Sequence, residues 1–419
     1  GRPRAAADIL SRFAANDSAD GCDMARLARC LADCGEWDAA RGVIGTAGAS
    51  ADEDAAAEIA AAALHVALLS PATKTLPATV AAEAPLVEPD PSPLPERPRI
   101  GVLATALGGP GDIESVATLA QGLRETGASL VVFGAGPLTA PHNRLLQGRV
   151  GRHIDAAEFD AFTLAHTVMT EGVDLLLDAG GIAAPLHLAT LAHHPAPRTA
   201  GWLNLPLDTG VAGLDRVLGA APPASGIIGR LDASPRLLPA DDVPLIGADI
   251  GAGAMHDDLL QALAAILRTV PDARLLLRDH ELSHPDMVGT LIERFGALSI
   301  ADRIEIVDTD HVTFIAGLDL LLHPFVAESG NDVVDATAHG TPAIALRGTS
   351  PWRRQGANAL QALGLGSRVA ATCDDYAAIG AGLLADRARA RAETAAVTAT
   401  APAFAPAAFA TGLLELFRA

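Results

Sequence analysis

Apolar residues recur at two different spacings along the chain, and the first of these is typical of helices. Residues 24–44 carry apolar side chains three and four positions apart, with a break at Cys34-Gly35 and a restart at Trp37. This pattern predicts two short antiparallel helices of the kind found in a tetratricopeptide (TPR) unit. A further helix is predicted over residues 55–69. We therefore expect a TPR-like helical segment over residues 1–70, whose usual role is to hold a peptide or a partner protein.

The pattern changes after residues 71–98, which carry eight prolines and are predicted to be a linker, extended in places. Beyond the linker, short apolar runs that suit buried strands alternate with amphipathic helical stretches. This alternation predicts a parallel sheet with helices on both faces. A second series of the same kind begins near residue 244. We therefore predict two successive α/β domains, over residues 99–240 and 241–419, with a cleft between them.

Composition and charge narrow the choice of partners. The formal net charge of −20 argues against nucleic acid and anionic membranes, because no basic stripe is present to meet phosphates. Lys74 is the single lysine, so a bound phosphate would be held by arginine, backbone N–H groups or helix N-termini. No run of 18 apolar residues occurs and no signal peptide opens the chain. We expect a cytoplasmic protein with no membrane insertion.

The strongest candidate site follows the apolar run that ends at His323. Gly330, Asn331 and Asp332 fall at a predicted helix N-terminus, with Asn or Asp as the N-cap. Free backbone N–H groups there would favour an anion such as a diphosphate. Asp335 lies one turn further on and could meet a sugar or ribose hydroxyl. The alternative is that the polar residues only cap the helix.

Two further places carry candidate chemistry. Arg353 and Arg354 open a predicted helix and suit phosphate or carboxylate binding, or else form a solvated pair. Cations at a helix N-terminus are unfavourable unless something negative is nearby, which favours a site. Asp178 stands at a strand end before a Gly-Gly turn, a position suited to catalysis or ligand contact. Nearby histidines, including His187, are either general bases or structural residues.

These stretches resemble the O-linked N-acetylglucosamine transferase family of the SPINDLY type. Within residues 172–220, "HPAP", "WLNLPLDTG" and "LDRVLGA" are similar to the family's Arg-Pro-Ala-Pro segment, its Trp-Leu-Gly-Tyr-Pro-Gly-Thr segment and the strand that follows. "HPFVAESGNDVVDATAHGTPAIAL" resembles its Gly-His/Asn-Thr-Thr-x-x-Asp motif. "RRQGANALQALGLGSRVA" resembles its Arg-x-x-x-Ser segment, with Arg354 on the family arginine. The likeness covers residues 99–415.

The resemblance implies a GT-B glycosyltransferase: two Rossmann-like domains with a deep cleft, preceded by TPR-like helices. It implies a nucleotide-sugar donor on the side of residues 241–419, a protein acceptor on the side of residues 99–240, and no metal or other cofactor. Asp335 would match the family's conserved Asp, and residues 330–332 would hold the donor phosphates together with His323. Asp178 is the best candidate for the catalytic base.

The sequence also departs from the family. Its Thr-Thr pair is Asn331-Asp332 here, and its donor-phosphate lysine falls at Ala254. The histidine that follows its strand-end Asp falls on Ile182, although the Asp itself is kept as Asp178. A carboxylate facing a diphosphate is repulsive. A donor with one phosphate and its own carboxylate, such as a cytidine-monophosphate-activated nonulosonic acid, would tolerate the loss of the lysine and could use Arg353 or Arg354.

Bacterial flagellin glycosyltransferases combine helical repeats with a GT-B domain. We therefore put forward the hypothesis that the chain is one of them. Two alternatives remain open. One is a noncatalytic GT-B module that binds proteins, and the other is a transferase that acts on a small molecule or a lipid.

Overall fold

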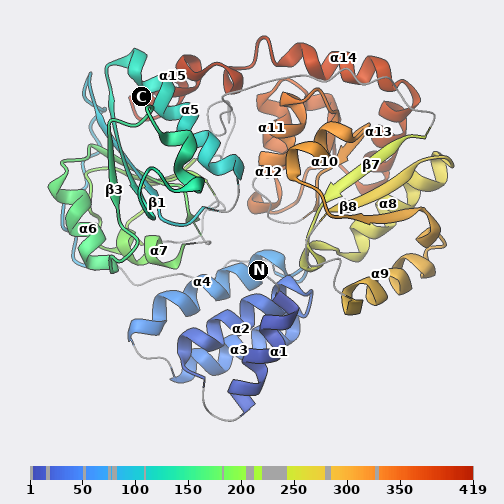
Figure 1. Cartoon of the computed structure of the whole chain (residues 1–419), viewed down its shortest axis with the longest axis horizontal. Coiled ribbons are helices and arrows are strands. Elements are labelled where there is room, and N and C mark those ends of the chain that lie inside the picture. The colour runs from blue at the N-terminus through green and yellow to red at the C-terminus, as the bar shows by residue number, and fades with distance from the viewer. Residues whose placement is uncertain are drawn as a thin grey trace. The chain divides into compact units, whose positions relative to one another are not determined.

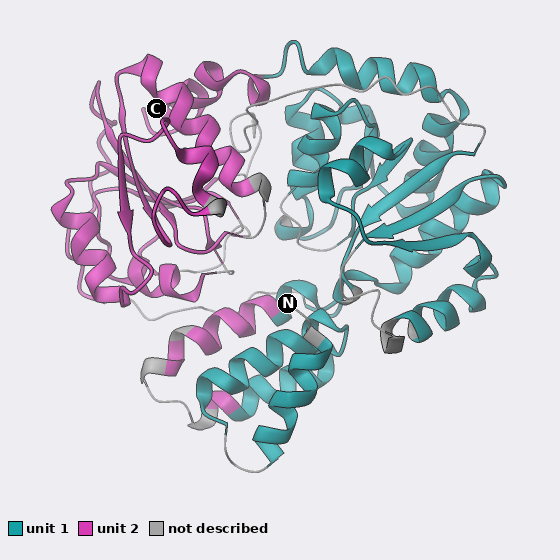
Figure 2. Ribbon diagram, viewed as in Figure 1, with its two compact units in different colours: residues 1–46, 66–74, 232–401 teal, residues 47–65, 75–231, 402–419 magenta. Residues whose placement is uncertain are grey.

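The computed structural model describes residues 3–15, 19–50, 53–73, 77, 83–107, 110–181, 184–203, 212–218, 243–278, 285–325 and 330–418. The chain divides into two compact units. Unit 1 comprises residues 1–46, 66–74 and 232–401, and unit 2 comprises residues 47–65, 75–231 and 402–419 (Figure 2). Each of the two predicted α/β sheets lies in a unit of its own.

Unit 1 contains, among its described residues, a six-stranded parallel sheet in the order β9-β8-β7-β10-β11-β12. With the strands numbered along the unit this is the doubly wound order 3-2-1-4-5-6. The strands are β7 (Leu245–Asp249), β8 (Arg274–Arg278), β9 (Ile304–Val307), β10 (Leu320–Leu322), β11 (Ala343–Leu346) and β12 (Val369–Ala370).

Helices pack around this sheet (Figure 1). They are α8 (Asp257–Thr269), α9 (Pro285–Ala297), α10 (His311–Gly317), α11 (Asn331–Ala338), α12 (Gln355–Ala362), α13 (Cys373–Ala385) and α14 (Arg387–Val397), with the short 3-10 turns η3 (Ala252–Ala254), η5 (Ala301–Arg303), η6 (Pro351–Arg353) and η7 (Gly366–Arg368). The main core joins strand residues such as Ile246 and Leu275 to Leu263 of α8 and the fully buried Tyr376 of α13.

The N-terminal helices are α1 (Pro3–Ala15), α2 (Gly21–Asp33), α3 (Trp37–Ser50) and α4 (Glu53–Leu69). Asp20 caps α2 by accepting a hydrogen bond from the Asp23 amide. Gly35 takes a left-handed conformation, with φ +82°, in the turn between α2 and α3. The helix–turn–helix predicted from the sequence is confirmed, with α3 beginning at Trp37.

Trp37 also fixes the helical segment to the sheet-bearing part of unit 1. Its indole N–H donates to the Gly253 carbonyl oxygen at 3.2 Å, and its ring meets the His256 ring edge-on, with the centroids 5.2 Å apart. His256 Nε2 lies 2.8 Å from the Leu69 carbonyl oxygen and donates to it. A Cβ on Gly253 would lie 2.3 Å from the Ala32 carbonyl oxygen, so only glycine allows this approach.

Unit 2 contains, in the part described, a second six-stranded parallel sheet in the order β3-β2-β1-β4-β5-β6, again 3-2-1-4-5-6. The strands are β1 (Arg99–Ala104), β2 (Ser129–Gly134), β3 (Arg152–Asp155), β4 (Leu175–Asp178), β5 (Thr199–Gly201) and β6 (Arg216–Val217), and the helices are α5 (Pro110–Thr126), α6 (Ala161–Thr170), α7 (Pro185–Ala192) and α15 (Pro406–Glu415), with η1 (Pro141–Leu146) and η8 (Pro402–Phe404). All four residues of β4 are buried, as expected for a strand covered on both faces.

The helix α15 lies in a different unit from the one predicted. The sequence-based division placed residues up to 419 in the second domain. Residues 402–419 belong to unit 2, because α15 packs its apolar face against α5. Phe409 and Leu413 are fully buried in that core. The two helices are so close that a Cβ on Gly122 of α5 would lie 1.9 Å from the Pro406 carbonyl oxygen.

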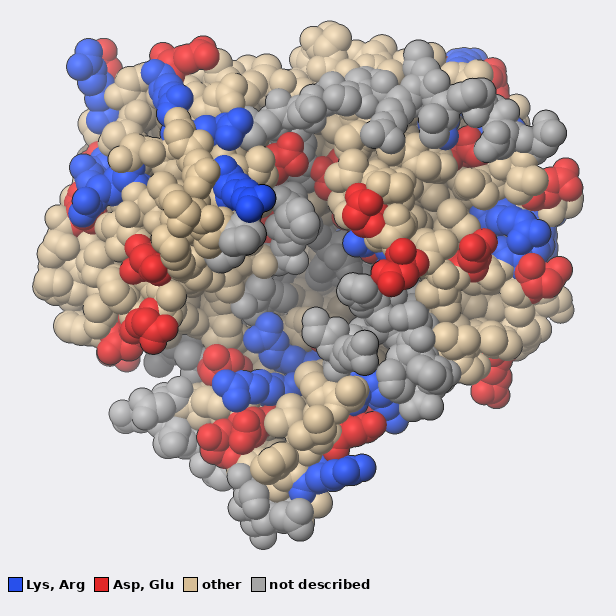
Figure 3. All heavy atoms as spheres, viewed as in Figure 1, with Lys and Arg blue, Asp and Glu red and all other residues tan. Residues whose placement is uncertain are grey.

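Charged side chains of both signs are interspersed over the described parts of the face shown in Figure 3. None of the helices in the described ranges is both long and apolar enough to span a bilayer.

Candidate functional site

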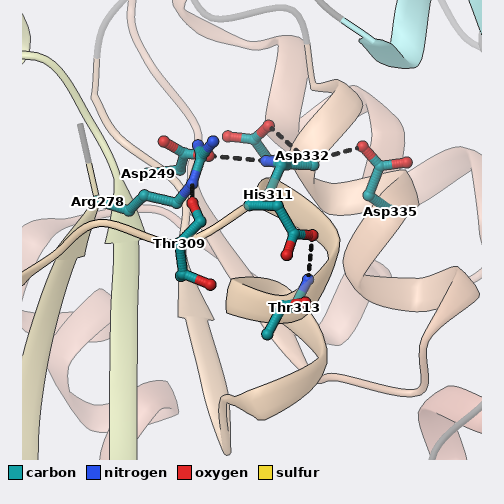
Figure 4. Close-up of polar contacts among 8 residues, drawn as sticks. Asp249, Arg278, Thr309, His311, Thr313, Asp332 and Asp335 are labelled. Atoms are coloured by element: carbon teal, nitrogen blue, oxygen red, sulfur yellow. Dashed lines mark hydrogen bonds and ion pairs between the residues drawn. The ribbon is translucent and has the colours of Figure 1, made fainter. Parts of the chain in front are cut away.

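Polar side chains gather at the carboxyl edge of the unit 1 sheet. Asp249 is the last residue of β7 and Arg278 the last of β8, and His311 opens α10 shortly after β9. Asp332 and Asp335 reach the same place from α11 (Figure 4). In doubly wound sheets, ligands bind outside the carboxyl ends of the strands. We call these five residues the His311 cluster.

His311 lies at the centre of the cluster, and each of its ring nitrogens meets a carboxylate. Nδ1 is 2.7 Å from Asp249 Oδ2, and Nε2 is 2.9 Å from Asp335 Oδ2 (Figure 4). Asp332 Oδ1 lies 3.9 Å from Nε2. Burial alone would lower the pKa of His311, but the hydrogen bonds to Asp249 and Asp335 and the charge of Asp332 outweigh it. They raise the pKa to about 10. The ring is therefore an imidazolium at neutral pH, donating from both nitrogens.

Arg278 supplies the second positive charge. Its guanidinium pairs with Asp249 and donates from Nε to the Thr309 carbonyl oxygen at 2.8 Å. The cluster thus holds two cations among three carboxylates. Asp249, His311 and Asp332 have ligand atoms within 4.8 Å of one another and could hold a metal ion. A metal would first have to displace a proton from His311, because both ring nitrogens are engaged with carboxylates.

The start of α11 differs in one detail from the sequence-based prediction. The N-cap is Gly330, with φ +69°, and it forms no side-chain capping bond. Asn331 and Asp332 are the first helical residues, so neither is the cap that we expected. A Cβ on Gly330 would lie 2.9 Å from the Gln355 carbonyl oxygen, so the position favours glycine both for its φ and for its closeness to the chain at α12. Asp335, one turn on, is brought to His311 as described above.

His323 is buried beneath α12 and does not reach His311. Its Nδ1 donates to the Pro324 carbonyl oxygen at 2.9 Å, and its own carbonyl accepts from the Tyr376 hydroxyl at 3.0 Å. A Cβ on Gly356 would meet the His323 ring at 2.6 Å. Burial outweighs the Pro324 bond and lowers the pKa of His323 to about 4, so the ring is neutral. In this structure it packs between α12 and α13.

The two adjacent arginines bind backbone carbonyls. Arg353 donates from Nη2 to the Ser70 carbonyl oxygen at 2.9 Å, and burial lowers its pKa. Arg354 donates from Nε to Gly348 and from Nη2 to Thr349, at 2.8 and 2.9 Å. Arg353 therefore helps to hold the end of the helical segment, together with the Trp37 contacts.

Asp178, the candidate base, is fully buried in unit 2 at the end of β4. One of its carboxylate oxygens accepts from the Gly180 amide at 3.0 Å, and both lie close to the Gly181 amide. Oδ1 also accepts from His187 Nδ1 at 2.8 Å. His187 Nε2 is in turn 2.6 Å from the Thr105 hydroxyl oxygen. Asp178 therefore meets solvent or substrate only through other groups.

The sequence-based candidates include Asp332 and Asp335 but not His311, Asp249 or Arg278, which the structure brings together with them. A signal was present. Asp249 and Arg278 each lie one residue before the end of a predicted strand and are the last residues of the observed β7 and β8, so the rule applied to Asp178 would have drawn attention to them. The position matching the family lysine, Ala254, lies buried at the end of η3. Ile182, which matches the family histidine, falls outside the described residues.

Comparisons with known proteins agree on one group. No protein-family model matches the chain. It is 24% identical over 270 residues to a probable UDP-N-acetylglucosamine–peptide N-acetylglucosaminyltransferase SPINDLY of Hordeum vulgare, covering 58% of this chain and 28% of that protein. The corresponding Arabidopsis thaliana protein is 24% identical over 262 residues, covering 55% and 28%. The matched region is thus under a third of these relatives' length.

Solved structures show the same fold. A Thermobaculum terrenum O-GlcNAc transferase mutant is similar with a TM-score of 0.80 and 22% identity, covering 100% of this chain and 87% of that one. HepE of Anabaena, in complex with UDP and glucose, is similar with a TM-score of 0.50 and 16% identity, covering 76% and 99%. Together with the two parallel sheets, these likenesses establish a GT-B fold preceded by TPR-like helices.

Proposed function

We propose that this chain, which belongs to the SPINDLY-type group of O-linked N-acetylglucosamine transferase-like GT-B proteins, is a glycosyltransferase. It would move a sugar from a nucleotide donor to a hydroxyl group of a protein acceptor. The observation that carries the proposal is the His311 cluster, at the carboxyl edge of a doubly wound sheet beside the N-terminus of α11.

The cluster suits the ribose and phosphate parts of a nucleotide. Asp335 and Asp332 can accept hydrogen bonds from sugar hydroxyls, and the positive charge of His311 partly neutralises the two carboxylates. The first N–H groups of α11 favour an anion. Asp332 in the first turn opposes a second phosphate group, so we favour a donor with a single phosphate, such as a cytidine-monophosphate-activated nonulosonic acid. Flagellin would then be a suitable acceptor.

Transfer would need no metal. The leaving phosphate would be stabilised by backbone N–H groups of α11 and by the positive charges of His311 and Arg278, in place of a bound cation. Arg354 is a further candidate, since its present partners are two backbone carbonyls near the surface.

A second candidate is a noncatalytic module that binds proteins through its N-terminal helices. Ala254 favours it, because a buried methyl group stands where the family has its donor-phosphate lysine.

A third candidate is a transferase with a small-molecule acceptor. Deleting residues 1–70 distinguishes it from a protein glycosyltransferase, because the deletion should abolish transfer to proteins and spare transfer to small acceptors. Because Trp37 and His256 join that segment to unit 1, the unfolding midpoint of the deletion variant must be checked.

Thermal unfolding with UDP, GDP, CDP, CMP and dTDP tests the proposal. A ligand present at 100 times its Kd stabilises the native protein by about 2.7 kcal/mol. We expect CMP to raise the melting temperature, and Asp335→Asn to abolish the rise. Asp374→Asn, which changes an exposed carboxylate at the start of α13, is the matched control and should respond as the wild type does.

The pattern of responses decides between the candidates. A rise with UDP instead of CMP would support a transferase with a diphosphate donor and remove the single-phosphate argument. If no nucleotide shifts the transition at millimolar concentration, the transferase proposal fails and the binding module replaces it.

A further inference from the structure

Thr105, His187 and Asp178 form a hydrogen-bonded chain at the centre of the unit 2 sheet. Thr105 directly follows β1, Asp178 ends β4, and these two strands pair side by side. In the strand order 3-2-1-4-5-6, this is the point where the order reverses, and such switch points are where doubly wound sheets bind ligands. His187 comes from the first turn of α7.

The geometry fixes the proton positions on His187. Nδ1 faces the Asp178 carboxylate, which only accepts, so Nδ1 carries the proton. Nε2 faces the Thr105 backbone N–H at 3.3 Å and the Thr105 hydroxyl at 2.6 Å. A backbone N–H can only donate, so Nε2 presents a lone pair and accepts from the hydroxyl as well. The order is therefore carboxylate, imidazole, hydroxyl, with the imidazole ready to accept a proton.

Of the three hydrogen-bonded residues, only Thr105 is accessible to solvent. Asp178 and His187 are 0% exposed, whereas Thr105 is partly exposed. A Cβ on Gly180 would lie 2.5 Å from His187 Nδ1, so the Gly-Gly turn is what lets the imidazole reach Asp178. A purely structural role, tying the end of β1 to α7, would need the backbone N–H bond of Thr105 but not its hydroxyl.

We propose that Thr105, His187 and Asp178 form a proton relay that deprotonates an acceptor hydroxyl bound at the carboxyl edge of unit 2. This inference rests on the proposed glycosyl transfer. The acceptor oxygen forms the new bond to the anomeric carbon of the donor, whose bond to phosphate oxygen breaks with the electron pair leaving on the phosphate. The acceptor proton passes to Thr105 Oγ1, and the Thr105 proton passes to His187 Nε2. Asp178 holds the resulting imidazolium, which returns its proton to water after release.

Thr105 would touch the acceptor and is the catalytic residue of this relay, and Asp178 and His187 act through it. Thr105→Val removes the hydroxyl but keeps the side-chain volume and the backbone N–H. Positioned proton transfer contributes about 10²–10⁴-fold to a rate. We expect Thr105→Val to lower kcat by about 10²-fold with KM for the acceptor unchanged, and Thr105→Ser to restore most of the rate.

The assay uses UDP-N-acetylglucosamine and CMP-N-acetylneuraminic acid as donors, with a library of Ser- and Thr-containing peptides as acceptor. Thr163→Val, on the exposed face of α6 in the same unit, is the matched control and should leave kcat unchanged. If the wild type transfers sugar and Thr105→Val keeps kcat within about twofold, far less than proton transfer contributes, the relay is refuted while the proposed function stands.

If the wild type transfers no sugar, the proposed function fails and the relay has no reaction to serve, and NMR of the His187 ring then tests the proton positions alone. We expect a downfield, slowly exchanging Nδ1 proton that Asp178→Asn removes, together with an unprotonated Nε2 whose ¹⁵N shift changes in Thr105→Val. A proton on Nε2 in the wild type, or an Nε2 shift that Thr105→Val leaves unaltered, would overturn the assignment.

Discussion

The charge on His311 should make the stability of unit 1 depend on pH in alkaline solution. In the folded protein the pKa of His311 is raised from its ordinary 6.5 to about 10. A group whose pKa is higher in the folded state stabilises the protein fully below its unfolded pKa. That stabilisation is lost as the pH rises through the folded value. The free energy of unfolding of unit 1 should therefore fall as the pH rises from about 6.5 to about 10.

The magnitude follows from the size of the shift. At 1.36 kcal/mol for each tenfold change in proton affinity, a rise from 6.5 to about 10 corresponds to about 5 kcal/mol. The His311 side chain retains 18% exposure, and the three carboxylates can relax when its charge is lost. We therefore expect about half of this, on the order of 2 kcal/mol, in the difference between wild type and His311→Gln near pH 7. That difference should approach zero above about pH 10.

Urea unfolding followed by tryptophan fluorescence measures this difference. Trp37 and Trp352 lie in unit 1 and Trp202 in unit 2, so both proteins carry Trp202→Phe to make the signal report unit 1. Val312→Gln changes the exposed neighbour of His311 on α10 and should differ from wild type by the same amount at every pH. The reasoning is refuted if the gap between wild type and His311→Gln is equally constant between pH 7 and 10.5.

Further predictions concern packing. Gly122→Ala should cost about 2 kcal/mol or more, because its Cβ would meet the Pro406 carbonyl oxygen, a backbone atom that moves only with α15. Gly45→Ala, in exposed α3 with nothing within 4 Å of the new Cβ, should stabilise the protein by about 0.5–1 kcal/mol. A denaturation midpoint that falls equally in both variants would contradict this. Tyr376→Phe should cost about 1 kcal/mol or more by leaving the buried His323 carbonyl without its hydroxyl donor, and an unchanged midpoint would contradict that.

The architecture could be predicted from the sequence because its signals are local. Runs such as Leu175–Asp178 are apolar at every position except the last, as strands buried on both faces must be. The break at Gly35 and the restart at Trp37 mark the turn between α2 and α3 within a few residues. Asp178 and Asp335 are also selected by local signals, since Asp178 ends a strand and Asp335 lies one turn into the helix that begins at Asn331.

The partners of these residues could not be predicted, because they come from distant parts of the chain. Asp249 and His311 are 62 positions apart, and no spacing rule links them. Arg353 was expected at a ligand, but its guanidinium donates to Ser70, 283 positions away. A pair of arginines at a helix start has the same appearance in either role. The choice depends on which carbonyls the folded chain brings within reach.

The packing of α15 on α5 bears on the order in which the protein can fold during synthesis. The face of α5 that carries Gly122 is covered by α15, whose Pro406 and Ala410 lie against it and are made almost 300 residues later. Domains generally fold as units while the chain emerges from the ribosome. Unit 2 must wait, with that face open to wrong partners, until the whole of the unit 1 sheet has been translated. A chaperone that binds nascent chains should therefore bind the uncovered face of α5, and it should be released only after α15 has been synthesised.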